Sequence, residues 1–180
     1  MRNVLDALYR LGGALAALFL VAIAVVVLAQ VGANLIGALS GWLTGERLGL
    51  VVPSYAEFAG YFLAASSFLG LAYTLRLGGH IRVNLVLGRL PAGVRRRLEL
   101  WCCAAALAMA GYFTFYLGNL AWESWSFGDV STGMVPVPLW IPQAVMTLGL
   151  GLLCIALLDE AVTLARGGEP DYLRHEQGSE

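Results

Sequence analysis

Amide and carboxylate side chains interrupt the apolar stretches of this sequence at helical spacing. Gln30 and Asn34 are four residues apart, and Gly37 follows three residues later on the same helix face. Glu57 and Gly60 show the same spacing in the next apolar stretch. Inside a membrane, such groups either line a path for an ion or a solute, or join one helix to another by hydrogen bonds.

Depth in the membrane favours the second role. Glu57 and Glu123 lie near the ends of their apolar stretches, where water can solvate a carboxylate, and no acidic residue lies near the middle of one. An ion-coupled carrier needs coordinating groups deep in the bilayer, often from broken helices. A transport path remains the alternative, but we expect helix packing or a partner-subunit interface for six residues: Gln30, Asn34, Gly37, Glu57, Gly60 and Asn119.

No residue pattern supports catalysis. His80 and His175 lie outside the apolar stretches, so neither is placed to be an axial haem ligand inside a membrane. Cys102, Cys103 and Cys154 fall within apolar stretches, which is typical of small buried hydrophobic residues rather than of a disulfide or a metal site. We therefore expect no enzyme activity, no cofactor and no metal.

The composition identifies lipid as the main solvent of the chain. Hydrophobic residues make up 59% of the 180 residues and charged residues 13%, against about 45–50% and about 25% in soluble proteins. A soluble fold would lack a polar surface, and a disordered chain would be rich in charge. The net charge of −1 gives no basic face for a nucleic-acid partner.

Four segments are long and apolar enough to cross a bilayer, at about 11–39, 55–75, 98–120 and 139–158. The sequence thus predicts an all-α integral membrane protein with four tilted transmembrane helices. The first segment is too long for a signal peptide and should tilt or project beyond the lipid. We expect one four-helix membrane domain over residues 1–166 and a frayed cytoplasmic tail over 167–180.

Arginine counting sets the orientation. Ten of the 11 basic residues, all of them arginines, lie at the two termini or between the second and third segments. Because basic residues collect in cytoplasmic loops, both termini are predicted to be cytoplasmic.

The connection between the second and third segments mixes apolar residues and arginines at helical spacing. This pattern predicts a short amphipathic helix at about 80–90, lying in the cytoplasmic membrane interface; a plain basic loop is the alternative. Four residues would position it: His80, Arg82, Asn84 and Arg89. Three arginines would anchor the next segment against anionic lipid: Arg95, Arg96 and Arg97.

Four stretches, in this order and topology, resemble the small membrane subunit of TRAP (tripartite ATP-independent periplasmic) transporters, the DctQ-like family. Asn84 stands where the family pattern Gly-x-His-[Ile/Val]-x-Val-Asp has Asp, so one charge is missing. The stretches cover most of the chain: Glu57–Tyr61 with Phe68–Gly70, Arg76–Leu85, Leu90-Pro91 with the arginine cluster, and Val137–Pro142.

The resemblance implies a complex in the inner membrane of a bacterium or an archaeon. A large, roughly twelve-span subunit would carry the substrate and sodium sites and move by an elevator-like mechanism. A periplasmic substrate-binding protein would deliver an organic acid such as a C4-dicarboxylate or sialic acid. The small subunit would contact lipid and brace the immobile scaffold of the large one.

The predicted function is therefore a non-catalytic small permease subunit of a sodium-coupled TRAP importer. Four residues near the outer boundary would contact the binding protein, or else anchor the interface and a solvated loop: Trp122, Glu123, Trp125 and Asp129. Two alternatives stay open. An independent carrier or channel would pass solute by itself, and a redox or quinone-handling subunit would show a haem or flavin spectrum.

Overall fold

The computed structural model describes residues 2–46, 48–77 and 91–166. The four helices are α1 (Arg2–Thr44), α2 (Tyr55–Arg76), α4 (Ala92–Phe127) and α5 (Trp140–Ala165). Each is long and apolar enough to cross a membrane, which confirms the prediction of an all-α membrane protein with four spans. The interfacial helix expected at 80–90 and the tail 167–180 lie outside the described residues.

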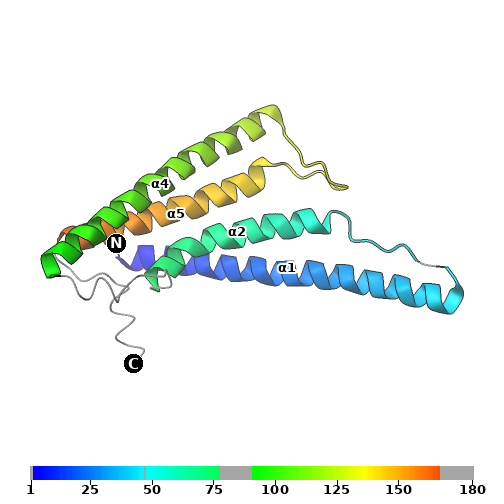
Figure 1. Cartoon of the computed structure of the whole chain (residues 1–180). Helices are drawn as coiled ribbons and strands as arrows, with labels where there is room; N and C mark the ends of the chain where they lie inside the picture. The colour runs from blue at the N-terminus through cyan, green and yellow to red at the C-terminus, as the bar shows by residue number, and fades with distance from the viewer. Residues whose placement is uncertain (1, 47, 78–90, 167–180) are drawn as a thin grey trace, which may run out of the picture.

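The helices stand in a row rather than in a closed bundle. α1 packs on α2, α2 on α5 and α5 on α4, so α1 and α4 form the two edges (Figure 1). The row converges at its basic end, where α1 and α4 begin, and spreads towards its loop end, which carries the connections 45–54 and 128–139. Because the helices are inclined to one another, they cannot all stand perpendicular to a membrane.

The two edge helices are longer than the apolar stretches that predicted them. α1 has 43 residues and α4 has 36, against expected spans of 11–39 and 98–120. Each continues until a glycine takes a positive φ, Gly45 at 76° and Gly128 at 69°. Glycine ends helices in this way because it adopts the left-handed conformation without a Cβ clash.

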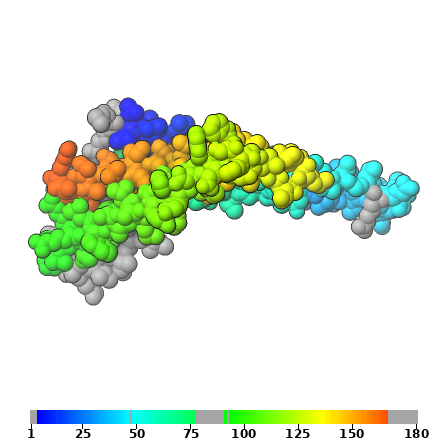
Figure 2. All heavy atoms as spheres, turned by 90° about the horizontal axis from the view of Figure 1, so that it is seen from above, coloured from blue at the N-terminus to red at the C-terminus, as the bar shows by residue number. Residues whose placement is uncertain are grey.

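The length of α1 exceeds any perpendicular membrane crossing. At 1.5 Å per residue it is about 64 Å long, whereas the hydrocarbon core is about 30 Å thick. Its last third and the connection that follows extend beyond the other helices (Figure 2). We call this part, residues 31–46 and 48–53, the α1 extension.

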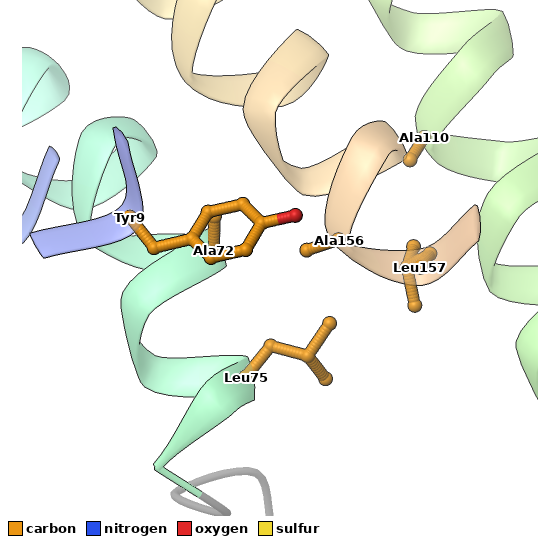
Figure 3. Close-up of a cluster of buried hydrophobic side chains, with 6 residues drawn as sticks. All are labelled: Tyr9, Ala72, Leu75, Ala110, Ala156 and Leu157. Carbon is orange, nitrogen blue, oxygen red and sulfur yellow. The ribbon is translucent and has the colours of Figure 1, made fainter. Parts of the chain in front are cut away.

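The buried core is small and lies towards the basic end. Six buried side chains from all four helices form it: Tyr9, Ala72, Leu75, Ala110, Ala156 and Leu157. The Tyr9 ring lies between α2 and α5 (Figure 3) and is only 2% exposed. Most large apolar side chains outside this core are exposed, as expected where lipid or another subunit covers them.

Glycines bring the helix backbones together along the row. A Cβ atom on Gly149 of α5 would lie 2.5 Å from the Phe68 carbonyl carbon of α2, and one on Gly12 of α1 would lie 2.9 Å from the Leu69 oxygen. Ser66 adds a buried hydrogen bond by donating its hydroxyl to the Ala16 carbonyl of α1 at 2.9 Å. Close backbone approach is how helices associate where lipid removes the hydrophobic driving force.

Candidate functional site and partner-facing surfaces

A charge cluster at the basic end joins three helices. The Arg76 guanidinium of α2 forms ion pairs with Asp6 of α1 and with Asp159 of α5, the latter at 3.3 Å between Nη1 and Oδ2. The guanidinium also lies 5.2 Å from the centre of the Tyr9 ring, within the range of a cation–π interaction. With the Arg76 side chain only 15% exposed, the cluster fixes these three helices relative to one another.

The three consecutive arginines at the start of α4 have different surroundings. Arg96 donates from Nε to the Leu164 carbonyl at 2.9 Å and from Nη2 to the Ala165 carbonyl at 2.7 Å. These are the last carbonyls of α5, where a cation also complements the helix dipole. Arg95 pairs with Glu99 one turn later, at 3.0 Å, and Arg97 is exposed.

The lipid-anchoring role that we expected for the three arginines stays a prediction. Arg96, although exposed, also ties α4 to the end of α5. The other predicted cytoplasmic-interface residues lie outside the described part of the chain: His80, Arg82, Asn84 and Arg89.

The polar face of α1 holds the next connection rather than another helix. Gln30 is buried and donates from Nε2 to the Asn34 Oδ1 atom at 3.1 Å. Its Oε1 atom accepts the Val52 N–H at 2.8 Å. The pair thus ties residue 52, just before α2, back onto α1.

The same face binds the connection again two turns later. The Leu48 carbonyl oxygen would lie 2.5 Å from a Cβ atom on Gly37, so only glycine leaves room for the chain there. Ser40 accepts the Leu48 N–H at 3.0 Å and donates to the Gly37 carbonyl at 2.9 Å. The α1 extension is therefore a two-layered arm, with the connection packed along the helix.

The connection 128–139 forms a small hairpin at the loop end. An isolated antiparallel bridge joins Val130 and Pro138. The Ser131 N–H donates to the Val137 carbonyl at 2.9 Å, and the Leu139 N–H donates to the Asp129 carbonyl at 3.0 Å.

The tip of this hairpin rests on the start of α2. Ser54 accepts the Val135 N–H at 2.9 Å, and Ser131 donates its hydroxyl to the Glu57 carboxylate at 3.4 Å. A Cβ atom on Gly133 would lie 1.8 Å from Glu57 Oε2, so a larger residue at the tip would displace the Glu57 carboxylate. Glu57 thus contacts the α4–α5 connection, which links the two helical pairs at the loop end.

The remaining predicted packing residues face outward. Gly60 is exposed on α2, and a Cβ atom there would meet nothing within 4 Å. Asn119 is exposed on α4. Within the described residues neither one packs against another helix. For these two residues, contact with a partner subunit therefore stays a prediction.

The four predicted periplasmic-contact residues are all exposed near the loop end: Trp122, Glu123, Trp125 and Asp129. The rings of Trp122 and Trp125 meet edge to face, 5.1 Å between centres. With Trp140 they line an open groove of about 580 Å³ between α4 and α5. Tryptophan at this place suits a membrane boundary, so interface anchoring and partner contact both fit the geometry.

Sequence reasoning missed the residues that hold the row together. Asp6, Arg76 and Asp159 are dozens of residues apart, and only the reversal of direction between successive spans brings such span ends together. The sequence offered one signal for this cluster: Asp6 and Asp159 are acidic residues at span ends on the side that the arginines predict to be basic. Gly12 and Gly149 gave no signal beyond their small size.

None of the described residues forms a group of three metal-ligating side chains. Cys102 is exposed, Cys103 is buried and Cys154 is partly buried, and all three are free thiols. The Cys154 sulfur lies 3.6 Å from the Thr114 hydroxyl. The prominent chemistry of the described structure is thus hydrogen bonding and ion pairing between segments.

Two comparisons with known proteins identify a family for this chain. Residues 47–167 match the family "Tripartite ATP-independent periplasmic transporters, DctQ component". The chain is also 26% identical over 106 residues to the C4-dicarboxylate TRAP transporter small permease protein DctQ of Rhodobacter capsulatus. That match covers 59% of this chain and 46% of the relative, so the chain spans about half of the relative's length. With its four apolar helices and a family match over two thirds of its length, the chain belongs to the DctQ family of TRAP transporter small permease components.

Proposed function

We propose that this chain braces the immobile scaffold of a large, roughly twelve-span subunit in a sodium-coupled TRAP importer. The importer takes up an organic acid that a periplasmic substrate-binding protein delivers. The small subunit itself is non-catalytic and carries no solute. It lies in the inner membrane of a bacterium or an archaeon.

The row of helices is the observation that carries this proposal. A solute path has to be surrounded by protein, whereas here each edge helix packs mainly on one neighbour. Glycine contacts bring the backbones of α2 and α5 together in the middle of the row. Over residues 2–46, 48–77 and 91–166, such a row offers broad surfaces to another subunit but encloses no path of its own.

Polar contacts at both ends support a rigid brace. The Arg76 cluster fixes α1, α2 and α5 at the basic end, and Arg96 ties α4 to α5 there. The hairpin at the loop end rests on Ser54 and Glu57 of α2. A brace needs such fixed spacing, because the mobile part of the large subunit moves against the scaffold that the brace holds.

The charge distribution supports an orientation with both termini in the cytoplasm. The basic end carries Arg76, Arg166 and the arginine cluster at 95–97, whereas the loop end carries Glu57, Glu123 and Asp129. Basic residues collect on the cytoplasmic side of membrane proteins. The hairpin and the tryptophan groove would then face the periplasm and the binding protein.

Purification and reconstitution test the proposal. A tagged chain expressed with the large permease of the same organism should recover that subunit from the membrane. Vesicles holding both subunits and supplied with the loaded binding protein should show sodium-dependent uptake, and vesicles holding this chain alone should show none. Uptake by this chain alone, or its isolation as a lone homo-oligomer, would contradict the proposal.

A further inference from the structure

The outward face of α4 carries a polar stripe. Tyr112, Tyr116, Asn119 and Glu123 follow one another at helical spacing, and all four are exposed. Tyr112 is 59% exposed and Tyr116 is 54% exposed. The buried Ala110 lies on the opposite face of α4, so these four residues, the α4 stripe, point away from the rest of the chain.

The polar atoms of the α4 stripe have no partner in the described part of the chain. Among the described residues, the structure gives no hydrogen bond or ion pair to the two tyrosine hydroxyls, the Asn119 amide or the Glu123 carboxylate, whereas the amides of Gln30 and Asn34 on α1 bond to each other. The two tyrosine rings contact each other, 4.5 Å between centres. Their hydroxyls and the amide are left for another molecule.

The position of the stripe along α4 places it at membrane depth. Trp122 and Trp125 mark the outer boundary, as tryptophans do in membrane proteins. Asn119 lies about one turn further in, and Tyr112 is about 15 Å from Trp122 along the helix, which in an inclined helix is at most about half of the hydrocarbon core. Lipid tails offer these groups no hydrogen bond, so exposing them to lipid is costly.

The other edge of the row has no such need. The exposed side chains along the middle of α1 are aliphatic, for example Leu18 at 62%, Val21 at 59% and Leu28 at 68%. The amides on α1, Gln30 and Asn34, bond to each other within the chain. Lipid is therefore a suitable neighbour for α1 and a poor one for α4.

We infer that the α4 stripe is the surface on which the large permease subunit docks. The partner segment presents a hydrogen-bonding side chain opposite Asn119 and a basic group near Glu123 at the outer boundary. Protein rather than lipid fits, because an amide and two phenols require directional partners at this depth. This inference rests on the proposed function and adds which edge of the row performs it.

Photo-crosslinking within the assembled complex tests the assignment. Benzoylphenylalanine replaces Tyr116 in one variant and Leu28 of α1 in a matched control, and each is expressed with the large subunit. We expect a covalent adduct with the large subunit from position 116 and none from position 28. An adduct with it from position 28, or adducts from position 116 only with lipid or a second copy of this chain, would overturn the inference.

Two substitutions at one position separate hydrogen bonding from shape. Asn119→Leu should reduce the large subunit recovered with this chain by about three- to ten-fold, the range expected for a lost hydrogen bond between helices in a membrane. Asn119→Gln keeps an amide and should restore most of the recovery. Full recovery with Asn119→Leu would count against the inference, whereas failure of the unaltered chain to bind any large permease would also remove the proposed function.

Discussion

The two edge helices of the row, α1 and α4, are alike in length and exposure but differ in what they expose. Each has only 11% of its most apolar window buried within the chain. α1 shows aliphatic side chains such as Leu18 and Leu28, whereas α4 shows Tyr112, Tyr116 and Asn119. Nearly every exposed residue of a membrane span is apolar. An exposed polar group without a hydrogen-bond partner is therefore the better indicator of contact with another protein.

Two asparagines make the same contrast residue by residue. Asn34 of α1 accepts a hydrogen bond from Gln30 at 3.1 Å, so its amide is engaged within the chain. Asn119 of α4 is exposed, as Asn34 is, but has no hydrogen bond in the described structure. Substituting the first should disturb this subunit itself, and substituting the second should disturb its assembly.

The largest effect is expected at Gly149, because its close contact with the α2 backbone joins the α4–α5 pair to the α1–α2 pair. Gly149→Ala would place a Cβ atom 2.5 Å from the Phe68 carbonyl carbon and should lower the free energy of unfolding by about 1–3 kcal/mol. Gly151→Ala is the matched control, since a Cβ atom there meets nothing within 4 Å. Thermal unfolding in detergent measures both. Equal melting temperatures for the two variants would contradict the close packing of α2 and α5.

The next effect is expected at the charge cluster of the basic end. Arg76→Gln leaves Asp6 and Asp159 without their shared guanidinium and should cost about 1–2 kcal/mol, between the values for exposed and buried ion pairs. Arg97→Gln, at an exposed arginine of the same end, should change stability little. Chemical unfolding of the purified subunit compares the two variants. An equal loss of stability in both would show that the ion pairs of Arg76 do not stabilise the contact between α1, α2 and α5.

A smaller and more local effect is expected on α1. Gln30→Leu removes the bond to the Val52 N–H and should cost about 1 kcal/mol. Hydrogen exchange should rise in the connection 48–54 while recovery of the large subunit stays unchanged. If this variant recovered less of the large subunit while hydrogen exchange in the connection stayed unchanged, α1 rather than α4 would be the edge that contacts the partner.

The smallest effect is expected on the lipid-facing side of α1. Leu28 is 68% exposed, so Leu28→Ala should change stability by no more than about 0.5 kcal/mol. Recovery of the large subunit should also stay the same. A several-fold drop in that recovery would show that α1 contributes to the interface.

Hydropathy alone predicted the four spans, because about 20 apolar residues in a row have few other uses. It did not predict where α1 and α4 end. Composition near Leu39 and Leu120 becomes less apolar, yet each helix continues to the glycine whose backbone turns left-handed, Gly45 and Gly128. Lipid-like composition and helical backbone are separate properties, and only the first is visible in a hydropathy window.

Periodicity identified polar faces but not what they contact. The spacing of Gln30, Asn34 and Gly37 correctly placed them on one helix face, and the segment that packs there is the connection at 48–52. The contact of Arg96 with the last carbonyls of α5 joins residues 68 positions apart. Such partners follow from the order of helices in the row, which no local pattern in the sequence specifies.

Oxygen accessibility in the assembled complex tests most directly whether α4 meets the partner and α1 meets lipid. A spin label is placed at position 28 or 116 of a chain whose native cysteines, Cys102, Cys103 and Cys154, are replaced by alanine. Binding of the large subunit should lower the collision rate with lipid-dissolved oxygen several-fold at position 116 and leave position 28 unchanged. A fall at position 28 with none at position 116 would contradict this account.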